Sequence, residues 1–213
     1  MMHNSLQIYN KLFNSYGPQG WWPAETPLEM MIGAILVQNT NWRNVDKALS
    51  NLKPYLNAES IEKLSTQDLA ELIRPSGYYN MKAHRIKSYL EWFKMYDYNI
   101  DLVKKIEKQQ LRSKLLNIHG IGHETADVIL LYAFDKPIFV VDAYARRIFY
   151  RLGYDMPKSY DAFRNQVEKK FPMNLKLYNE FHALLVEHAK RYCKTNPVCP
   201  ECPLLEICMR RYD

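Results

Sequence analysis

The chain has 213 residues, of which 47% are hydrophobic and 24% are charged, as in an ordinary globular protein with one sizeable core or two small lobes. Its longest apolar run, residues 30–37, is far too short to span a bilayer, and the first residues lack the basic and apolar segments of a signal peptide, so we expect a cytoplasmic protein. Lysine and arginine outnumber the acidic residues by 29 to 23, and the resulting net charge of +6 suits a polyanionic partner without identifying one.

Apolar residues recur at three- and four-residue spacing along most of the chain, which predicts an all-α protein. The predicted helices cover residues 4–16, 27–38, 42–53, 66–74, 81–96, 101–116, 123–134, 142–153, 159–170 and 175–192. Thr26, Ser65 and Asp142 stand where a side-chain oxygen can cap the helix that follows. Residues 137–141 have a β-like composition but no partner strand, so we interpret them as a buried connector. Short loops between about ten helices favour two helical lobes with a ligand-binding cleft between them.

Residues 115–126 predict two helices joined by a tight turn that contains Gly120 and Gly122. Glycine lets a backbone come close to a partner, and the amides that open the second helix point outward at the positive end of its dipole. The turn is therefore a candidate phosphate site, although a helix–helix turn without any ligand would have the same spacing.

The turn has the sequence Leu-x-x-Ile-x-Gly-Ile-Gly, and Asp142 follows it by 20 residues with Pro137 just before. This pattern resembles the helix-hairpin-helix and Gly/Pro-Asp signature of the endonuclease III superfamily of DNA glycosylases, and the similarity extends from about residue 26 to the final cysteine. The resemblance implies a monomer that acts on double-stranded DNA containing a damaged base. It also implies that Gly120 and Gly122 hold a DNA phosphate, often through a monovalent cation.

The same resemblance implies an all-α architecture of two lobes. Residues 27–134 would form a six-helix lobe that contains the hairpin. Residues 1–26 and 135–213 would form a discontinuous second lobe that ends in a four-cysteine loop, with a DNA-binding cleft between the lobes.

Asp142 is the candidate catalytic residue, because the resemblance places it at the mouth of a pocket that receives a flipped nucleotide. Breaking an N-glycosidic bond builds positive charge on the sugar, and a nearby carboxylate stabilises that charge. It can also orient or deprotonate the attacking water. Asp142 can at the same time be a plain N-cap, which is worth about 1 kcal/mol.

Glu124 occupies the position where members of the family that also cleave the DNA backbone carry a lysine. That lysine forms a Schiff base with the sugar, and a carboxylate cannot. We therefore predict a monofunctional enzyme that uses water as the nucleophile and leaves an abasic site. His123 is not a substitute, since neighbouring residues of a helix point about 100° apart.

Three segments are similar to the 3-methyladenine glycosylase branch of this superfamily, which also carries glutamate at the lysine position; they are residues 21–23, 38–42 and 75–83. The resemblance implies that aromatic rings stack on an alkylated purine, and Trp21, Trp22 and Trp42 are the candidates. An alkylated purine is cationic and favours an aromatic face. Core packing is the other reading of each tryptophan.

Gln38 falls where the family places a residue that fills the gap left by the flipped base. Tyr78 falls where a wedge residue enters the opposite strand, which would offset part of the cost of unstacking. An exposed loop tyrosine without that role would look the same.

All four cysteines, Cys193, Cys199, Cys202 and Cys208, lie within the last 21 residues, which predicts a metal or cluster site rather than disulfides. Four thiolates can bind zinc or a [4Fe–4S] cluster, and gaps of five, two and five residues do not decide between them. The pattern resembles the family's cluster loop, whose usual first gap is one residue longer. That resemblance favours a [4Fe–4S] cluster over zinc, with a structural role.

Three functions remain open from the sequence. The first is a monofunctional alkylpurine DNA glycosylase. The second is a mismatch-specific glycosylase that removes thymine or adenine. The third is a DNA-binding module without catalysis, against which the presence of Asp142 argues.

Overall fold

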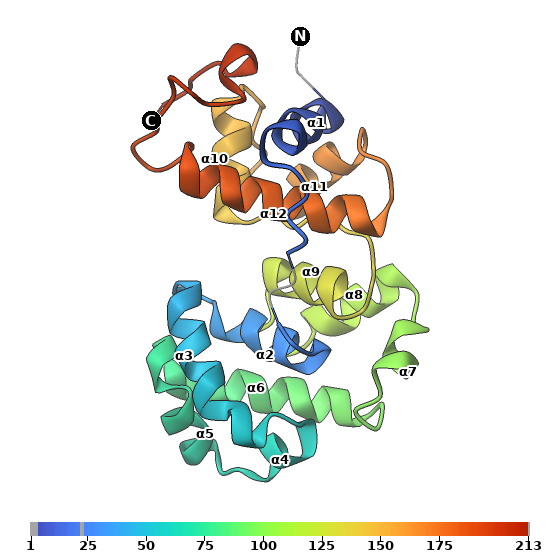
Figure 1. The fold of residues 1–213 in the computed structure, drawn as a ribbon. Coiled ribbons are helices and arrows are strands. Elements are labelled where there is room, and N and C mark those ends of the chain that lie inside the picture. Colours follow the sequence, from blue (N-terminus) through green and yellow to red (C-terminus); the bar gives the residue numbers. More distant parts are fainter. Residues whose placement is uncertain (1–3, 22–23, 213) are drawn as a thin grey trace. The chain divides into compact units, whose positions relative to one another are not determined.

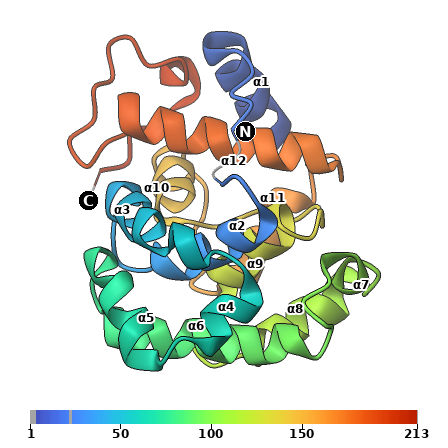
Figure 2. The same cartoon turned by 60° about the horizontal axis from the view of Figure 1, so that its bottom comes forward.

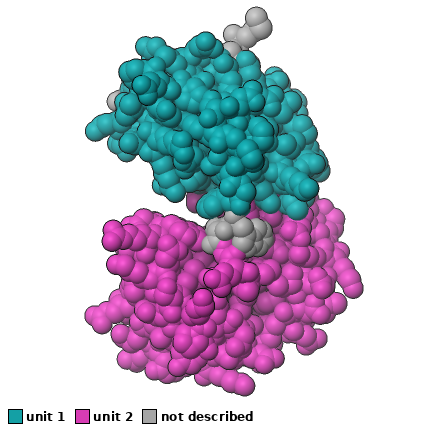
Figure 3. Space-filling view, viewed as in Figure 1, with its two compact units in different colours: residues 1–21, 137–213 teal, residues 22–136 magenta. Residues whose placement is uncertain are grey.

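The computed structural model describes residues 4–21 and 24–212, and within those ranges it contains helices, turns and loops but no strand (Figure 1). The prediction of an all-α protein is confirmed. The chain divides into two compact units, residues 1–21 with 137–213 (unit 1) and residues 22–136 (unit 2), which Figure 3 colours separately. None of the helices that the structure describes is long and apolar enough to cross a membrane.

Unit 2 is built from the eight α-helices between residues 27 and 132. They are α2 (Pro27–Leu36), α3 (Trp42–Leu52), α4 (Ala58–Lys63), α5 (Thr66–Leu72), α6 (Tyr79–Lys94), α7 (Ile100–Lys104), α8 (Lys108–Leu116) and α9 (His123–Tyr132), with 3₁₀ turns η1 (Lys53–Tyr55) and η2 (Arg74–Ser76). α2 is buried over most of its length and packs against α3, α6 and α9. α6 packs against α4 and α5 (Figure 2). The core therefore surrounds α2, the helix that leads into Gln38.

Unit 1 combines the first helix of the chain with its last ones. These are α1 (Ser5–Tyr16), α10 (Ala143–Arg151), α11 (Tyr160–Glu168) and α12 (Leu175–Arg191), followed by the 3₁₀ turn η3 (Leu205–Ile207). α12 packs against both α1 and α10.

A cluster of four buried phenylalanines forms the centre of unit 1. Phe139, Phe149, Phe163 and Phe181 meet with ring centroids 5.4–6.4 Å apart, mostly edge to face or tilted. Each such pair contributes about 0.5–1.5 kcal/mol beyond simple burial. Because Phe139 lies in the connector that precedes α10, the cluster anchors that connector and so fixes where α10 begins, at Asp142.

Helix caps account for most of the element boundaries that the sequence predicts. The side chain of Thr26 accepts a hydrogen bond from the amide of Glu29 at 3.1 Å, and that of Ser65 accepts from Asp68 at 3.0 Å. The predicted helix over 101–116 is wrong as a single element. Glu107 interrupts it with extended backbone and caps α8 by accepting from the amides of Gln109 and Gln110, so two helices form. The six-residue helix α4 was not predicted from the sequence.

Candidate functional site

The hairpin in unit 2 is the turn between α8 and α9. Its two glycines differ in how far the backbone conformation and the surrounding space require glycine. Gly120 has φ +84°, and a Cβ there would lie 2.2 Å from Cγ of Arg85, so both backbone and packing exclude a side chain. Gly122 has φ −88° and nothing within 4 Å of a would-be Cβ. Neither fold nor space requires glycine at 122, but its bare backbone leaves the first amides of α9 open to close approach.

A buried ion pair fastens the two helices of the hairpin together. Nε of Arg112 donates to Oδ1 of Asp127 at 2.6 Å, and a terminal nitrogen of Arg112 donates to Oδ2 at 3.2 Å. The same guanidinium lies 3.1 Å from Nδ1 of His123, the first residue of α9. A two-point contact of this kind fixes the angle between α8 and α9 as well as their distance.

Gln38 is held at both ends of its amide, by the hairpin at its nitrogen and by Arg85 of α6 at its oxygen. Its nitrogen donates to the carbonyl of Gly120 at 3.1 Å and to Oγ1 of Thr125 at 2.9 Å. Its oxygen accepts a hydrogen bond from Arg85. The structure thus brings together two predicted DNA-contacting features, Gln38 and the hairpin, within unit 2.

Glu124 is exposed in the first turn of α9, next to His123. A carboxylate is favoured there by the positive end of the helix dipole. The carboxylate offers no amine for covalent chemistry, in keeping with its sequence interpretation.

Tyr78 is 66% exposed and adopts a left-handed conformation with φ +47° at the start of α6. A bulky side chain rarely adopts this conformation without support from its surroundings. That support comes from Lys82, whose buried ammonium donates to the carbonyls of Leu36 and Ser76 at 2.8 and 2.7 Å. Lys82 therefore ties the end of α2, just before Gln38, to the turn that presents Tyr78. Burial, with a smaller contribution from nearby Arg85, lowers the pKa of Lys82 to about 8.

The three candidate tryptophans have different surroundings. Trp42 begins α3 in unit 2 and is half-buried, and its ring fits over Gly33, where a Cβ would lie 3.3 Å from the ring edge. Trp21 belongs to unit 1, is 36% exposed and lies against the ring of His182 with centroids 5.4 Å apart. Trp22 lies outside the described residues.

Asp142 is the N-cap of α10 in unit 1, as predicted, and is only 9% exposed. Its Oδ1 accepts from the amide of Ala145 at 2.6 Å, and its Oδ2 lies 3.5 Å from Nε2 of His182. His182, on α12, is 6% exposed and touches both Asp142 and Trp21. No motif in the sequence singles out this histidine. Nothing in its spacing identifies its neighbours, because the contact joins residues 40 apart in the chain.

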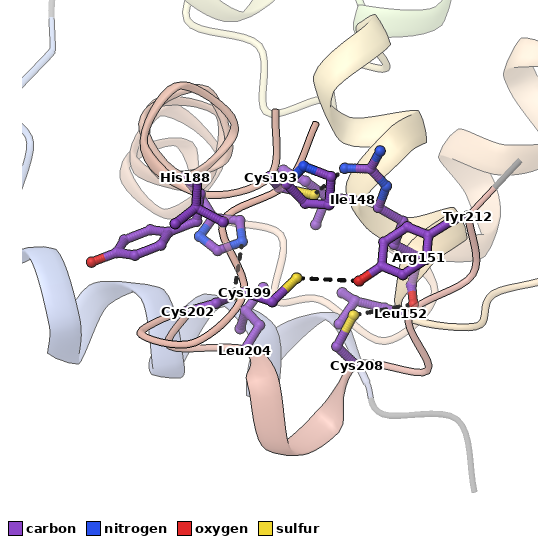
Figure 4. Close-up of a pocket in the computed structure, with 13 residues that line it drawn as sticks. Ile148, Arg151, Leu152, His188, Cys193, Cys199, Cys202, Leu204, Cys208 and Tyr212 are labelled. Atoms are coloured by element: carbon purple, nitrogen blue, oxygen red, sulfur yellow. Dashed lines mark hydrogen bonds between the residues drawn. The ribbon is translucent and has the colours of Figure 1, made fainter. Parts of the chain in front are cut away.

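All four cysteines line one pocket of unit 1 (Figure 4). Their sulfurs make separate contacts: Cys193 with Arg151 at 3.5 Å, Cys199 with the Tyr212 hydroxyl at 3.2 Å, Cys202 with Nε2 of His188 at 3.7 Å, and Cys208 with the Arg151 carbonyl at 3.2 Å. Among the residues that the structure describes, no three His, Cys, Asp or Glu side chains are grouped as ligands of a metal ion.

The chemistry of this pocket nevertheless fits a thiolate-bound metal or cluster. Its lining holds the four thiols and no carboxylate, so thiolates are the main anionic donors that it offers, beside the phenols of Tyr192 and Tyr212. Burial raises the pKa of Cys202 to about 11 and also raises that of Cys208, because a bare thiolate is poorly solvated there. A bound cationic metal centre would supply the missing counter-charge.

The sequence matches a known family and a known relative. The family model described as HhH-GPD superfamily base excision DNA repair protein matches residues 32–173. The Methanocaldococcus jannaschii protein named "Putative DNA repair glycosylase MJ1434" is 45% identical over 210 residues, which cover 96% of this chain and 96% of that protein.

Two solved structures extend the comparison. The crystal structure of H. pylori 3-methyladenine DNA glycosylase bound to 1,N6-ethenoadenine has a TM-score of 0.78 and 30% identity, and the match covers 89% of this chain and 98% of that one. A trapped endonuclease III–DNA covalent intermediate has a TM-score of 0.83 over 98% of this chain and 97% of that one, at 22% identity, and therefore shows the fold alone.

Proposed function

The chain belongs to the HhH-GPD superfamily of base excision DNA repair proteins, and on that premise we propose that this DNA glycosylase is monofunctional and removes alkylated purines such as 3-methyladenine. It would hydrolyse the N-glycosidic bond of a flipped base and leave an abasic site. The observation that carries the proposal is the exposed carboxylate of Glu124 in the first turn of α9, at the position where backbone-cleaving relatives need an amine.

The substrate class is supported by the 30% identity to a 3-methyladenine glycosylase and by the tryptophans at 21, 22 and 42. Trp21 and Trp42 are only partly buried, so each retains ring surface for a ligand. A cationic base gains most from an aromatic face, and its bond to the sugar is already weak. Stacking and modest electrostatic help would then suffice.

Asp142 would supply that help. With its Oδ1 engaged by the Ala145 amide, its orientation is set before the substrate arrives, so little reorganisation is needed as positive charge develops on the sugar. The same carboxylate can take a proton from the attacking water.

DNA binding would use the features gathered on unit 2. The amides after Gly122 would hold a backbone phosphate, with or without a monovalent cation, while Tyr78 would wedge into the duplex and Gln38 would fill the gap left by the flipped base. For Gln38 to do so, its contacts with the hairpin would have to loosen or serve as its anchor. We further propose that the enzyme acts in the cytoplasm as a monomer.

Cys193, Cys199, Cys202 and Cys208 would hold a [4Fe–4S] cluster, with zinc as the alternative occupant of the same thiols. When bound, the cluster would cross-link the C-terminal loop and take no part in breaking the glycosidic bond. The colour and metal content of freshly purified protein separate the two: a colourless protein containing zinc would contradict the iron assignment.

The test of the function is base release from methylated duplex DNA by the unmodified protein and by Asp142→Asn, with freed bases and strand breaks measured together. Asparagine caps helices as well as aspartate does, so this variant keeps the fold while losing the charge. We expect free 3-methyladenine from the unmodified protein alone, intact strands, and no covalent complex after borohydride reduction.

Other outcomes point to the alternatives. Strand cleavage or a trapped covalent complex would mean that another residue acts as an amine nucleophile. Release of thymine or adenine from mismatched DNA, with none from methylated DNA, would make the protein a mismatch glycosylase. Binding without release from any substrate would indicate a non-catalytic module.

A further inference from the structure

One buried histidine links two residues that the proposed function treats separately. His182 projects from α12 and meets Oδ2 of Asp142 through Nε2 at 3.5 Å, while its ring lies against Trp21 at a centroid distance of 5.4 Å and an angle of 54°. All three residues belong to unit 1, and α12 packs directly on α10, the helix that Asp142 caps.

The two carboxylate oxygens of Asp142 contact different parts of unit 1. Oδ1 is engaged by the backbone of its own helix, which would hold the carboxylate in place even without catalysis. Oδ2 faces His182 from another helix, where the side chain of Asp142 is only 12% exposed. A carboxylate in so enclosed a site gains from a second donor at its other oxygen. Nε2 of His182 lies 3.5 Å from Oδ2, at the outer limit of a hydrogen bond, and an imidazole N–H there is a donor that needs no positive charge.

The absence of an added charge matters for the reaction. An oxocarbenium ion is stabilised by the net negative charge of Asp142, which a permanent cation at Oδ2, such as lysine or arginine, would cancel. An imidazole can donate from Nε2 without carrying a charge, so it can orient the carboxylate and leave the negative charge of Asp142 available.

We propose that His182 is a positioning residue of this glycosylase: it fixes Oδ2 of Asp142 for the developing cation and supports Trp21, so that the aromatic face and the carboxylate are set by one side chain. The inference rests on the proposed catalytic role of Asp142. It does not depend on which base is removed.

Two replacements separate the contacts of His182. His182→Phe keeps a ring against Trp21 but removes the donor to Asp142. His182→Gln keeps a donor but removes the ring. The matched control is His84→Phe, since His84 is exposed on α6 and takes no part in the site. Thermal unfolding of each variant identifies any that fails to fold.

The measurement is the affinity for duplex DNA with one of two abasic analogues, a cationic pyrrolidine and its neutral tetrahydrofuran counterpart. Their affinity ratio reports how well the site stabilises positive charge at the sugar, whatever the lesion. We expect the unmodified protein to favour the pyrrolidine. His182→Phe should lose about 10-fold of that preference, the low end for a hydrogen bond to a charged group because the two atoms lie 3.5 Å apart, while tetrahydrofuran binding stays unchanged. His182→Gln should retain most of the preference, and Asp142→Asn should lose it.

Each result has one meaning. A folded His182→Phe with the full preference would overturn the proposal, as would equal losses with Phe and Gln, because a merely structural histidine does not distinguish them by their donors. An unmodified protein without any preference would overturn the role of Asp142 and this inference with it. If the preference behaves as expected but methylated DNA releases no base, only the substrate in the proposed function fails.

Discussion

The ion pair between Arg112 and Asp127 gives the sharpest test of how the hairpin is held. Asp127→Asn keeps the shape of the side chain but removes its charge, leaving the Arg112 guanidinium in a site where its side chain is only 8% exposed. Removing one partner of a buried pair typically costs about 3–5 kcal/mol. The two hydrogen bonds that are weakened, at about 1.5–3 kcal/mol each, lead to the same range.

Urea unfolding of four proteins measures this cost: the unmodified chain, Asp127→Asn, Arg112→Met and a double variant with Arg112→Met and Asp127→Leu. Asp127→Asn should lower the free energy of unfolding by about 3–5 kcal/mol. In a parallel thermal melt, where each kcal/mol lowers the Tm of a chain of this size by about 2–4 °C, its Tm should fall by roughly 6–20 °C. The double variant should be more stable than either single one, because it removes both buried charges together. DNA affinity should fall in both single variants as the angle between α8 and α9 loosens.

Additive losses in the double variant, or a loss below about 1 kcal/mol for Asp127→Asn, would refute this reasoning. Either result would mean that apolar packing, rather than the ion pair, fixes the hairpin.

Three further predictions follow from single features of the structure. Gly120→Ala should lower the free energy of unfolding by about 1–3 kcal/mol, because residue 120 has a positive φ and its new Cβ would clash with Arg85. Gly122→Ala should change that free energy by less than about 0.5 kcal/mol but should weaken DNA binding. Denaturation and DNA-binding titrations measure the two effects. Between about pH 8 and 10.5, Lys82 keeps its proton in the unfolded chain but has released it in the folded protein. The free energy of unfolding of the unmodified protein, measured relative to that of Lys82→Met, should therefore rise with pH by up to about 3 kcal/mol across this window. Under the proposed [4Fe–4S] assignment, Cys202→Ser should purify without visible absorbance or iron, while the helical content of unit 2, seen after limited proteolysis, persists.

These predictions fail in distinguishable ways. If Gly122→Ala binds DNA as tightly as the unmodified protein, the proposed phosphate site at the start of α9 is wrong. A stability difference between the unmodified protein and Lys82→Met that is constant from pH 8 to 10.5 would mean that two carbonyl partners keep the lysine charged. Full iron content in Cys202→Ser would exclude that thiol as a ligand.

Most helices could be predicted because their signals are local. The cap at Thr26 and the proline that follows it fix the start of α2, and the periodic apolar residues up to Arg191 fix the length of α12. The break at Glu107 was missed because an acidic side chain that caps a helix and one that merely faces solvent look the same in a sequence. The helix α4 was missed because six residues are too few to show a period.

In the candidate site, too, the features with local sequence signals could be predicted and the contacts between distant segments could not. Asp142, Gly120 and Glu124 stand out because their spacing to one another resembles a known signature. The contacts of His182 and Lys82 could not be predicted, since each depends on the packing of helices that are distant in sequence. The roles of the predicted residues stay predictions until the variants are measured.

Unit 1 is built from both ends of the chain, and this affects how it folds during synthesis. The hydroxyl of Ser5, in α1, donates to the carbonyl of Val167 across 162 residues, and α1 packs on α12. A ribosome makes about 5–20 residues per second, so α1 emerges many seconds before its partners exist, while all of residues 22–136 can fold in the interval. The apolar face of α1, with Ile8 and Leu12, is meanwhile uncovered and open to chaperones or to aggregation. Moving residues 4–21 to the C-terminus by circular permutation would remove this delay.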